Sequence, residues 1–401
     1  MRFSKGNGYK RKKDPGIGFW NFKLALILLA LPAIMFAQPG PSEDPYFIQG
    51  VEQYNQGDYV LARESFTTAI GVFPESGQAY FYRAYCSMYL HDVKAARPDL
   101  LMAQKLLGKD DPYVLIGFGY LYNESAEYKK AVKYLDRAVD VDHTLADAYN
   151  NRGISYQGLR RYKEAIRNYT MALQYDSTLS LAYNNRGTAI YYNQDVAAPH
   201  RTDIEMAIRD FTKALQLTPD LCLAMRNRGL AYSFLEKYTD AVSDLTKAIE
   251  CDPQNALNYL SRGVAKAKMN MYNDAINDFQ NALEIDKDLP DAYIEMGSAK
   301  AKMGDYEGGL NDQFTALAMD RSYAGLAYYN IACIKALTED KEGMIVNLKK
   351  AKKEGYFNSR FNVQNFSKDE DFKEYRRDED FIKFTRTIKS KANQYFSEEG
   401  K

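Results

Sequence analysis

The chain has 401 residues, with 53 basic and 53 acidic side chains, and therefore no formal net charge. The charge is unevenly spread, because residues 1–37 carry seven of the basic side chains and one acid, which leaves −6 on the rest of the chain. An acidic body without a basic stripe argues against nucleic acid as a partner.

The first 37 residues have the three parts of a secretory signal peptide. A basic stretch precedes the apolar run Leu24–Ala37, and a polar break begins at Gln38. This order is typical of signal peptides, and the 14 residues of the run are too few to span a bilayer comfortably. We expect export to the periplasm or envelope, with cleavage after Ala37. The alternative is an uncleaved inner-membrane anchor formed by residues 19–37. Residues 38–44 are a Pro/Gly linker.

The rest of the chain is dominated by a repeat. The sequence Tyr-Asn-Asn-Arg-Gly at 149–153 returns at 183–187, which is 34 residues further on, and variants follow at 225–229 and 259–263. A second motif, Tyr-Lys-Glu-Ala at 162–165, also recurs later in the chain. A fixed period near 34 residues indicates an array of helical hairpins. In such an array each unit contacts only its neighbours, so most of the chain can form one elongated body.

This pattern resembles the tetratricopeptide repeat, whose 34 positions carry small residues at 8, 20 and 27 and aromatic residues at 4, 17 and 24. The resemblance implies an all-α, right-handed superhelical solenoid of about nine repeats over residues 45–355, followed by a C-terminal helical cap at 356–401. The small residues let the two helices of a repeat approach closely, and the aromatic rings fill the space between them. The frame places repeats 1 to 4 at about 43–76, 77–111, 112–145 and 146–179, repeat 5 at 180–221, and repeats 6 to 9 at 222–255, 256–289, 290–323 and about 325–355. Repeat 5 is longer than the others, and we place its insertion at 193–203. Insertions of this kind map to loops, either as binding elements or as tolerated surface changes.

The four cysteines show no metal-binding spacing, so no metal site is expected. Cys222 and Cys251 fall at the start and end of one repeat. These ends lie side by side in an antiparallel helix pair, which makes a disulfide possible in an oxidising compartment. The sequence favours the other interpretation, in which the two are separate buried thiols.

Signals of catalysis are nearly absent. The three histidines His91, His143 and His200 are scattered, and the sequence contains no nucleophile elbow, P-loop or HExxH motif. We therefore expect a non-enzymatic protein without cofactors.

The candidate binding residues follow from the repeat frame. Position 6 of the first helix faces the concave groove in this family, and an asparagine there offers two donors and one acceptor to a peptide backbone. One asparagine per repeat resembles the ladder of the members fused to sugar transferases. The alternative interpretation is that asparagine is simply frequent at this position in the family. A carboxylate clamp is disfavoured, because Leu181 and Leu223 replace the required basic residues. The predicted groove residues are Asn150, Asn151, Asn184, Asn185, Tyr191, Tyr192, Arg226, Asn227, Phe234 and Asn330.

The arginines at position 7 have a structural interpretation. Arg152, Arg186, Arg228 and Arg262 recur with acids at position 23, and pairing each arginine with the acid of the following repeat matches all four. We therefore predict ion pairs between repeats that fix the stacking register, with little net gain in stability.

The sequence thus predicts an exported scaffold for protein–protein interaction that binds a protein or peptide in its groove. Membrane contact is expected only if the N-terminal segment is not cleaved. Two alternatives remain open: a substrate-recruiting accessory subunit of an envelope enzyme, and a membrane-anchored scaffold. The partner and the pathway do not follow from the residues.

Overall fold

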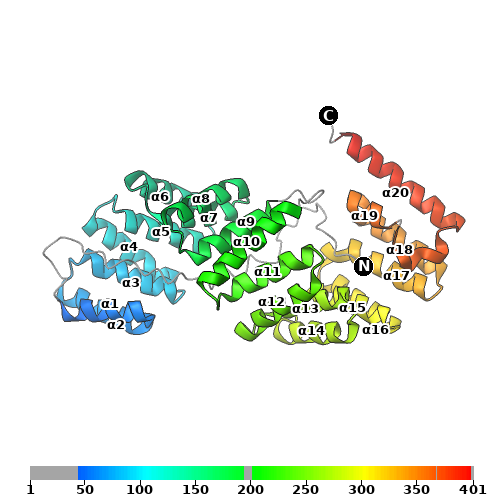
Figure 1. Ribbon diagram of the computed structural model, residues 1–401, viewed down its shortest axis with the longest axis horizontal. Coiled ribbons are helices and arrows are strands. Elements are labelled where there is room, and N and C mark those ends of the chain that lie inside the picture. The colour runs from blue at the N-terminus through cyan, green and yellow to red at the C-terminus, as the bar shows by residue number, and fades with distance from the viewer. Residues whose placement is uncertain (1–43, 194–200, 367, 399–401) are drawn as a thin grey trace. The chain divides into compact units, whose positions relative to one another are not determined.

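The computed structural model describes residues 44–193, 201–366 and 368–398, and these residues form helices without any strand. Nine helix pairs follow one another along the chain (Figure 1). The first helices of the pairs are α1 (Pro45–Gln56), α3 (Gly77–Tyr89), α5 (Pro112–Glu124), α7 (Ala146–Gly158), α9 (Ser180–Tyr192), α11 (Cys222–Phe234), α13 (Ala256–Lys268), α15 (Pro290–Lys302) and α17 (Ala324–Leu337). The second helices are α2 (Tyr59–Val72), α4 (Val93–Leu107), α6 (Tyr128–Val141), α8 (Tyr162–Tyr175), α10 (Arg201–Leu217), α12 (Tyr238–Cys251), α14 (Tyr272–Ile285), α16 (Tyr306–Met319) and α18 (Lys341–Lys353).

The described residues divide into two compact units. The N-terminal unit consists of α1 to α9 together with residues 206–219, and the C-terminal unit consists of residues 201–205 and the chain from Asp220 onward. Within each unit the two helices of a pair pack on each other, and each second helix packs on the first helix of the next pair. Successive first helices also contact one another, for example α5 with α7 and α7 with α9. The first helices therefore form one layer of each unit.

The small residue at position 8 sets the spacing between the helices of a pair, as predicted. A Cβ atom built on Gly153 would lie 2.5 Å from Cε1 of Tyr169, which is fully buried. The same close approach joins Gly263 to the ring of Phe279. Because these distances leave no room for even one additional carbon, the glycine permits the large ring opposite it to fill the core.

The short turn inside the repeats has a constant backbone conformation. Position 15 has a positive φ in every repeat whose turn is described. Gly57 and Gly304 occupy it in repeats 1 and 8, where glycine adopts this conformation without strain. Elsewhere the position holds residues with side chains, such as Arg160 (φ 59°) and Glu236 (φ 62°). The turn geometry is thus imposed by the packing of the two helices, even where the local residue does not favour it.

The position-7 arginines are paired, but the predicted partners are wrong. Wherever position 23 holds an acid, the arginine binds the acid of its own repeat: Arg186 binds Asp210 through Nε and Nη2, both at 2.8 Å, and Arg228 binds Asp244 in the same two-pronged way. Arg152 faces Asn168, whose Oδ1 accepts a bond of 2.7 Å from its Nε. The reason is geometric. The residues at positions 8 and 24 meet where the two helices of one repeat pack together, and positions 7 and 23 lie next to them and face each other across that same interface.

A different bond links these arginines to their neighbours. The remaining nitrogen, Nη1, reaches back to the second helix of the preceding repeat. Arg152 donates to Asp136 at 2.8 Å, and Arg262 donates to Thr246 at 3.2 Å. The guanidinium therefore ties three helices together, and the stacking register is fixed by a bond to the preceding repeat.

The chain after α18 packs on the last repeat. It contains η3 (Tyr356–Asn358), α19 (Arg360–Phe366), η4 (Glu370–Tyr375) and α20 (Glu379–Glu398), while the short η2 (Arg321–Tyr323) precedes α17. Phe366, Phe372 and Phe381 form one buried cluster with Tyr329 of α17. At the edge of this cluster, the hydroxyl of Tyr329 donates to Asp369 at 2.5 Å, and Lys302 forms an ion pair with Asp371. The cluster removes the apolar face of the last pair from water.

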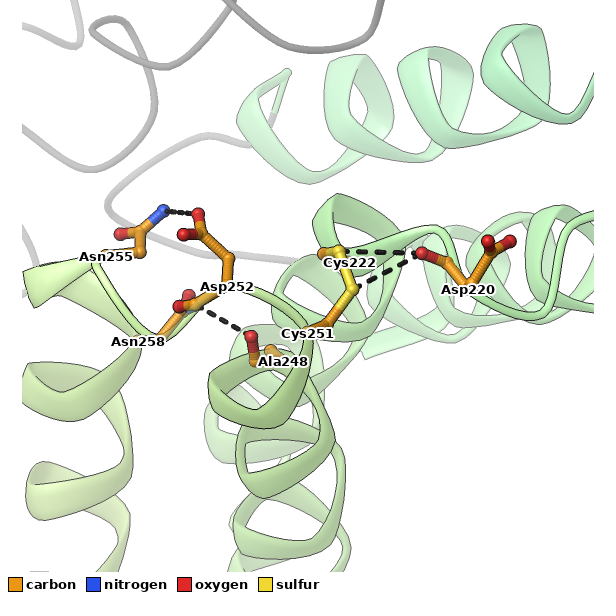
Figure 2. The surroundings of a disulfide bond; sticks show 7 residues. All are labelled: Asp220, Cys222, Ala248, Cys251, Asp252, Asn255 and Asn258. Atoms are coloured by element: carbon orange, nitrogen blue, oxygen red, sulfur yellow. Dashed lines mark hydrogen bonds between the residues drawn. A yellow bond between two sulfur atoms is a disulfide. The ribbon is translucent and has the colours of Figure 1, made fainter.

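Cys222 and Cys251 form a disulfide, which corrects the interpretation of separate thiols (Figure 2). The bond joins the start of α11 to the end of α12, where their Cα atoms are 5.7 Å apart. The carbonyl oxygen of Asp220 lies 3.5 Å from one sulfur and 3.4 Å from the other. The sequence placed the two residues at adjacent helix ends, but only the structure brings the sulfurs within bonding distance. Cys86 and Cys333 are buried free thiols.

Among the described residues, no helix combines the length and the apolar character that crossing a membrane requires. The predicted signal segment and linker up to residue 43 lie outside the described residues, as do residues 194–200 of the repeat 5 insertion.

Candidate peptide-binding groove

The predicted groove residues lie on the layer of first helices. Asn150 and Asn151 belong to α7, and Asn184 and Asn185 belong to α9, so these four fall in the N-terminal unit. Arg226, Asn227 and Phe234 on α11, and Asn330 on α17, fall in the C-terminal unit. The candidates therefore fall into two groups, one in each unit.

The asparagines of α7 and α9 bond to one another. The Nδ2 of Asn185 donates to Oδ1 of Asn150 at 3.4 Å, and the Nδ2 of Asn184 donates to Oδ1 of Asn185 at 3.3 Å. All three side chains are buried. The amides thus form a continuous row across the boundary between two repeats, and their hydrogen bonds help to hold α7 and α9 together. One donor remains unused, because the Nδ2 of Asn150 is buried and has no hydrogen-bond partner.

The other asparagines are bonded differently. The Nδ2 of Asn151 donates to the carbonyl oxygen of Asp147 one turn earlier in the same helix, at 3.0 Å, so this amide is engaged with its own backbone. The Nδ2 of Asn330 donates to Gln313 of α16 at 3.3 Å. Asn227 is half-buried on α11. Asparagines that are equally spaced in the sequence therefore have different environments. The boundary between repeats 4 and 5 is where asparagines of consecutive repeats bond to each other.

The aromatic candidates of α9 form a small cluster. The rings of Tyr191 and Tyr192 meet edge to face with centroids 5.3 Å apart, and Tyr192 stacks on Tyr162 of α8 at 6.1 Å. Desolvation raises the pKa of the Tyr191 phenol to about 12, so the group is neutral at physiological pH. In the other unit, the side chain of Arg226 is 4% exposed and Phe234 is half-buried.

Asp147 is a groove residue that the sequence reasoning missed. It occupies position 2 of repeat 4, one helical turn before Asn150 and Asn151, and its Oδ1 atom is buried without a hydrogen-bond partner. Desolvation, with a smaller contribution from Asp176, raises the pKa of its carboxyl group to about 7. Leucines occupy position 2 of the three following repeats, so a carboxylate at this position was the signal available in the sequence.

Stacked helix pairs with one layer of first helices and close glycine–aromatic contacts define the class of helical repeat scaffolds. Family models of the tetratricopeptide repeat match residues 49–111, 146–179 and 226–255, and a model of the TPR repeat matches residues 267–304. The chain belongs to the tetratricopeptide repeat proteins.

Several solved structures are similar to parts of this chain. The structure of pilF from Pseudomonas aeruginosa is 18% identical, covers 52% of this chain and 91% of its own, and has a TM-score of 0.46. YrrB, described as a TPR protein with an unusual peptide-binding site, is 22% identical over 48% of this chain and 95% of its own, with a TM-score of 0.39. MamA from Desulfovibrio magneticus is 20% identical over 44% and 96%, with a TM-score of 0.39. A comparison with curated proteins gave no match.

Proposed function

We propose that this chain is a non-enzymatic scaffold that binds an extended segment of a partner protein along its first-helix layer. The observation that carries the proposal is the row of amides and aromatic rings on α7 and α9. There, Asn150 keeps an unused buried donor beside the interacting side chains of Asn184 and Asn185. An extended peptide presents a backbone acceptor and donor at every residue, and side-chain amides suit both.

We further propose that the chain acts outside the cytoplasm, in envelope assembly or secretion. Two observations support this. The N-terminal sequence has the order of a signal peptide, and the Cys222–Cys251 disulfide is of a kind that persists in oxidising compartments. Fractionation followed by N-terminal sequencing tests the first point, because cleavage after Ala37 leaves Gln38 as the first residue. A full-length chain in the membrane fraction would instead support the anchored form.

The binding face is tested by site-specific photocrosslinking of the full chain in cells. A photoreactive phenylalanine analogue replaces Tyr191 in one variant and the exposed Lys163 of α8 in the control. We expect a crosslinked partner peptide from position 191 and not from position 163. Mass spectrometry identifies the peptide, and its synthetic form should bind the chain saturably. Crosslinks confined to position 163 would move the binding face to the second helices.

A further inference from the structure

We propose that the groove of the N-terminal unit selects peptides with a Lys or Arg residue, which it holds at Asp147 and Asn150. This inference rests on the proposed function and adds the chemistry of the ligand. Asp147 and Asn150 are three residues apart on α7 and therefore lie on one face of the helix. Each presents a buried polar atom without a partner: an acceptor, Oδ1 of Asp147, and a donor, Nδ2 of Asn150.

The acceptor belongs to a carboxyl group whose charge is uncompensated when the group is ionised. Within the described residues Asp147 forms no ion pair, and the charged group that most affects it after desolvation is another acid, Asp176. Burying a carboxylate without a partner costs several kcal/mol or forces the group to take up a proton. An ammonium or guanidinium group supplied by a ligand would remove this penalty. Binding of a cationic group would therefore offset the desolvation penalty that the Asp147 carboxylate carries in the free protein.

The surroundings fit a cationic side chain. Asp147 is within electrostatic range of Tyr85 on α3 and Tyr113 on α5, and Asp111 adds a second carboxylate to the same surface. Tyrosine faces attract cations through the quadrupole of the ring, and the attraction grows when both partners are shielded from water. A basic side chain held at Asp147 would therefore lie within electrostatic range of these tyrosines.

The charge pattern of the whole unit points in the same direction. Across repeats 1 to 5, the predicted groove positions 2, 5, 6, 9, 12 and 13 hold three charged residues, Asp44, Glu124 and Asp147, and no basic one. The corresponding positions of repeats 6 to 8 in the C-terminal unit hold three basic residues, Arg226, Lys268 and Lys302, and two acids, Asp291 and Glu295. The preference for a basic segment is thus assigned to the N-terminal unit, where the charges are complementary.

The donor completes the arrangement. With its Oδ1 already accepting from Asn185, Asn150 has its Nδ2 left to donate to a backbone carbonyl oxygen of the same peptide. The ligand is therefore an extended segment whose basic side chain enters beside Asp147 while its backbone passes Asn150. A negatively charged or purely apolar segment would leave the carboxylate unpaired.

The test is a selection of random 12-residue peptides displayed on phage against the full chain. It is run in parallel on Asp147→Asn and on the matched control Asp140→Asn, which removes an exposed acid from the second helix α6. We expect peptides enriched in Lys and Arg from the wild type and from D140N, and no such enrichment from D147N. Each variant replaces one carboxyl group with an amide, and D140N removes the exposed one, so a general loss of acidic attraction cannot produce this difference.

The best peptide is then synthesised with its basic residue or with norleucine in its place, and binding is measured by fluorescence anisotropy. We expect the norleucine peptide to bind the wild type at least tenfold more weakly, with a much smaller difference for D147N. Peptides that bind without basic enrichment would overturn this inference while leaving the proposed function intact. If D147N still selected peptides enriched in Lys and Arg, Asp147 would not be the residue that binds the basic side chain. A selection that recovers no binding peptide would count against both proposals.

Discussion

Asp278 is the residue whose loss should cost most among the paired acids of the repeats. Its side chain is 3% exposed and compensates two cations. Arg262 binds it through Nε at 3.0 Å and Nη2 at 2.7 Å, and Lys266 approaches to 2.8 Å. The substitution Asp278→Asn keeps the shape of the side chain and removes its charge, which leaves two adjacent cations of like sign in a largely buried site.

The expected cost follows from this geometry. Removing one partner of a buried ion pair costs about 3–5 kcal/mol, because the remaining charge is left uncompensated. The side chains of Arg262 and Lys266 are 16% and 17% exposed, so water screens part of their repulsion. We therefore expect a loss near the lower end, about 3 kcal/mol. Asp244→Asn is the internal control, because among the described residues Asp244 of the preceding repeat forms an ion pair with Arg228 alone.

The assay is urea unfolding of the full chain, combined with hydrogen exchange of the amides in α13 and α14 to locate the loss. D278N should lower the local stability of this pair by more than D244N lowers that of α11 and α12. The difference should persist in 0.5 M salt, where the Debye length is below about 8 Å, because buried pairs are screened weakly. Equal costs for the two variants, or a D278N cost below about 1 kcal/mol, would refute the reasoning from uncompensated charge.

Three further predictions concern other parts of the fold. Replacing Cys222 and Cys251 with Ser should lower the free energy of unfolding by about 3.6 kcal/mol, the chain-entropy value for a 29-residue separation, and reductant should produce the same loss of Tm in the wild type. Gly153→Ala should cost about 1–3 kcal/mol through overpacking, whereas Gly71→Ala, at an exposed helical position with open space around its Cα, should be neutral or stabilising in thermal melts. The pKa of Asp147 is raised from 3.8 to about 7, so its contribution to stability is present below pH 4 and is lost as pH rises to about 7. D147N should remove up to about 4 kcal/mol of this pH dependence in urea titrations, and an unchanged profile would contradict the burial of this carboxyl group.

Much of the fold could be predicted because the spacing of small and aromatic residues along the chain reflects the local packing of each helix pair. The 34-residue period indicated helix pairs, and glycine opposite an aromatic ring indicated where they approach. The same spacing could not choose the acid that Arg186 binds, since the acids of its own repeat and of the next both fit the pattern. That choice depends on how the two helices of a pair are rotated about their axes, and the structure places Asp210 opposite the guanidinium.

The candidate site was predicted less completely. The frame located the asparagines on the first helices but treated position 6 as equivalent in every repeat. The structure separates them, because Asn151 bonds its own helix while Asn185 bonds Asn150 of the neighbouring repeat. Asp147 was passed over because an acid in a helical repeat normally faces water, and the tyrosines of α3 and α5 within its electrostatic range are distant in sequence.

The sequence by itself indicated an all-helical array, because a period near 34 residues is typical of stacked helix pairs, and its small and aromatic residues resemble the frame of the tetratricopeptide repeat. The tertiary structure decided which polar atoms meet. The Cys222–Cys251 bond, the three-helix contacts of the arginines and the unpaired carboxylate of Asp147 all depend on distances between helices. Periodicity fixes which face of a helix is buried, whereas hydrogen bonds and ion pairs require atoms to be placed within about 3 Å of one another.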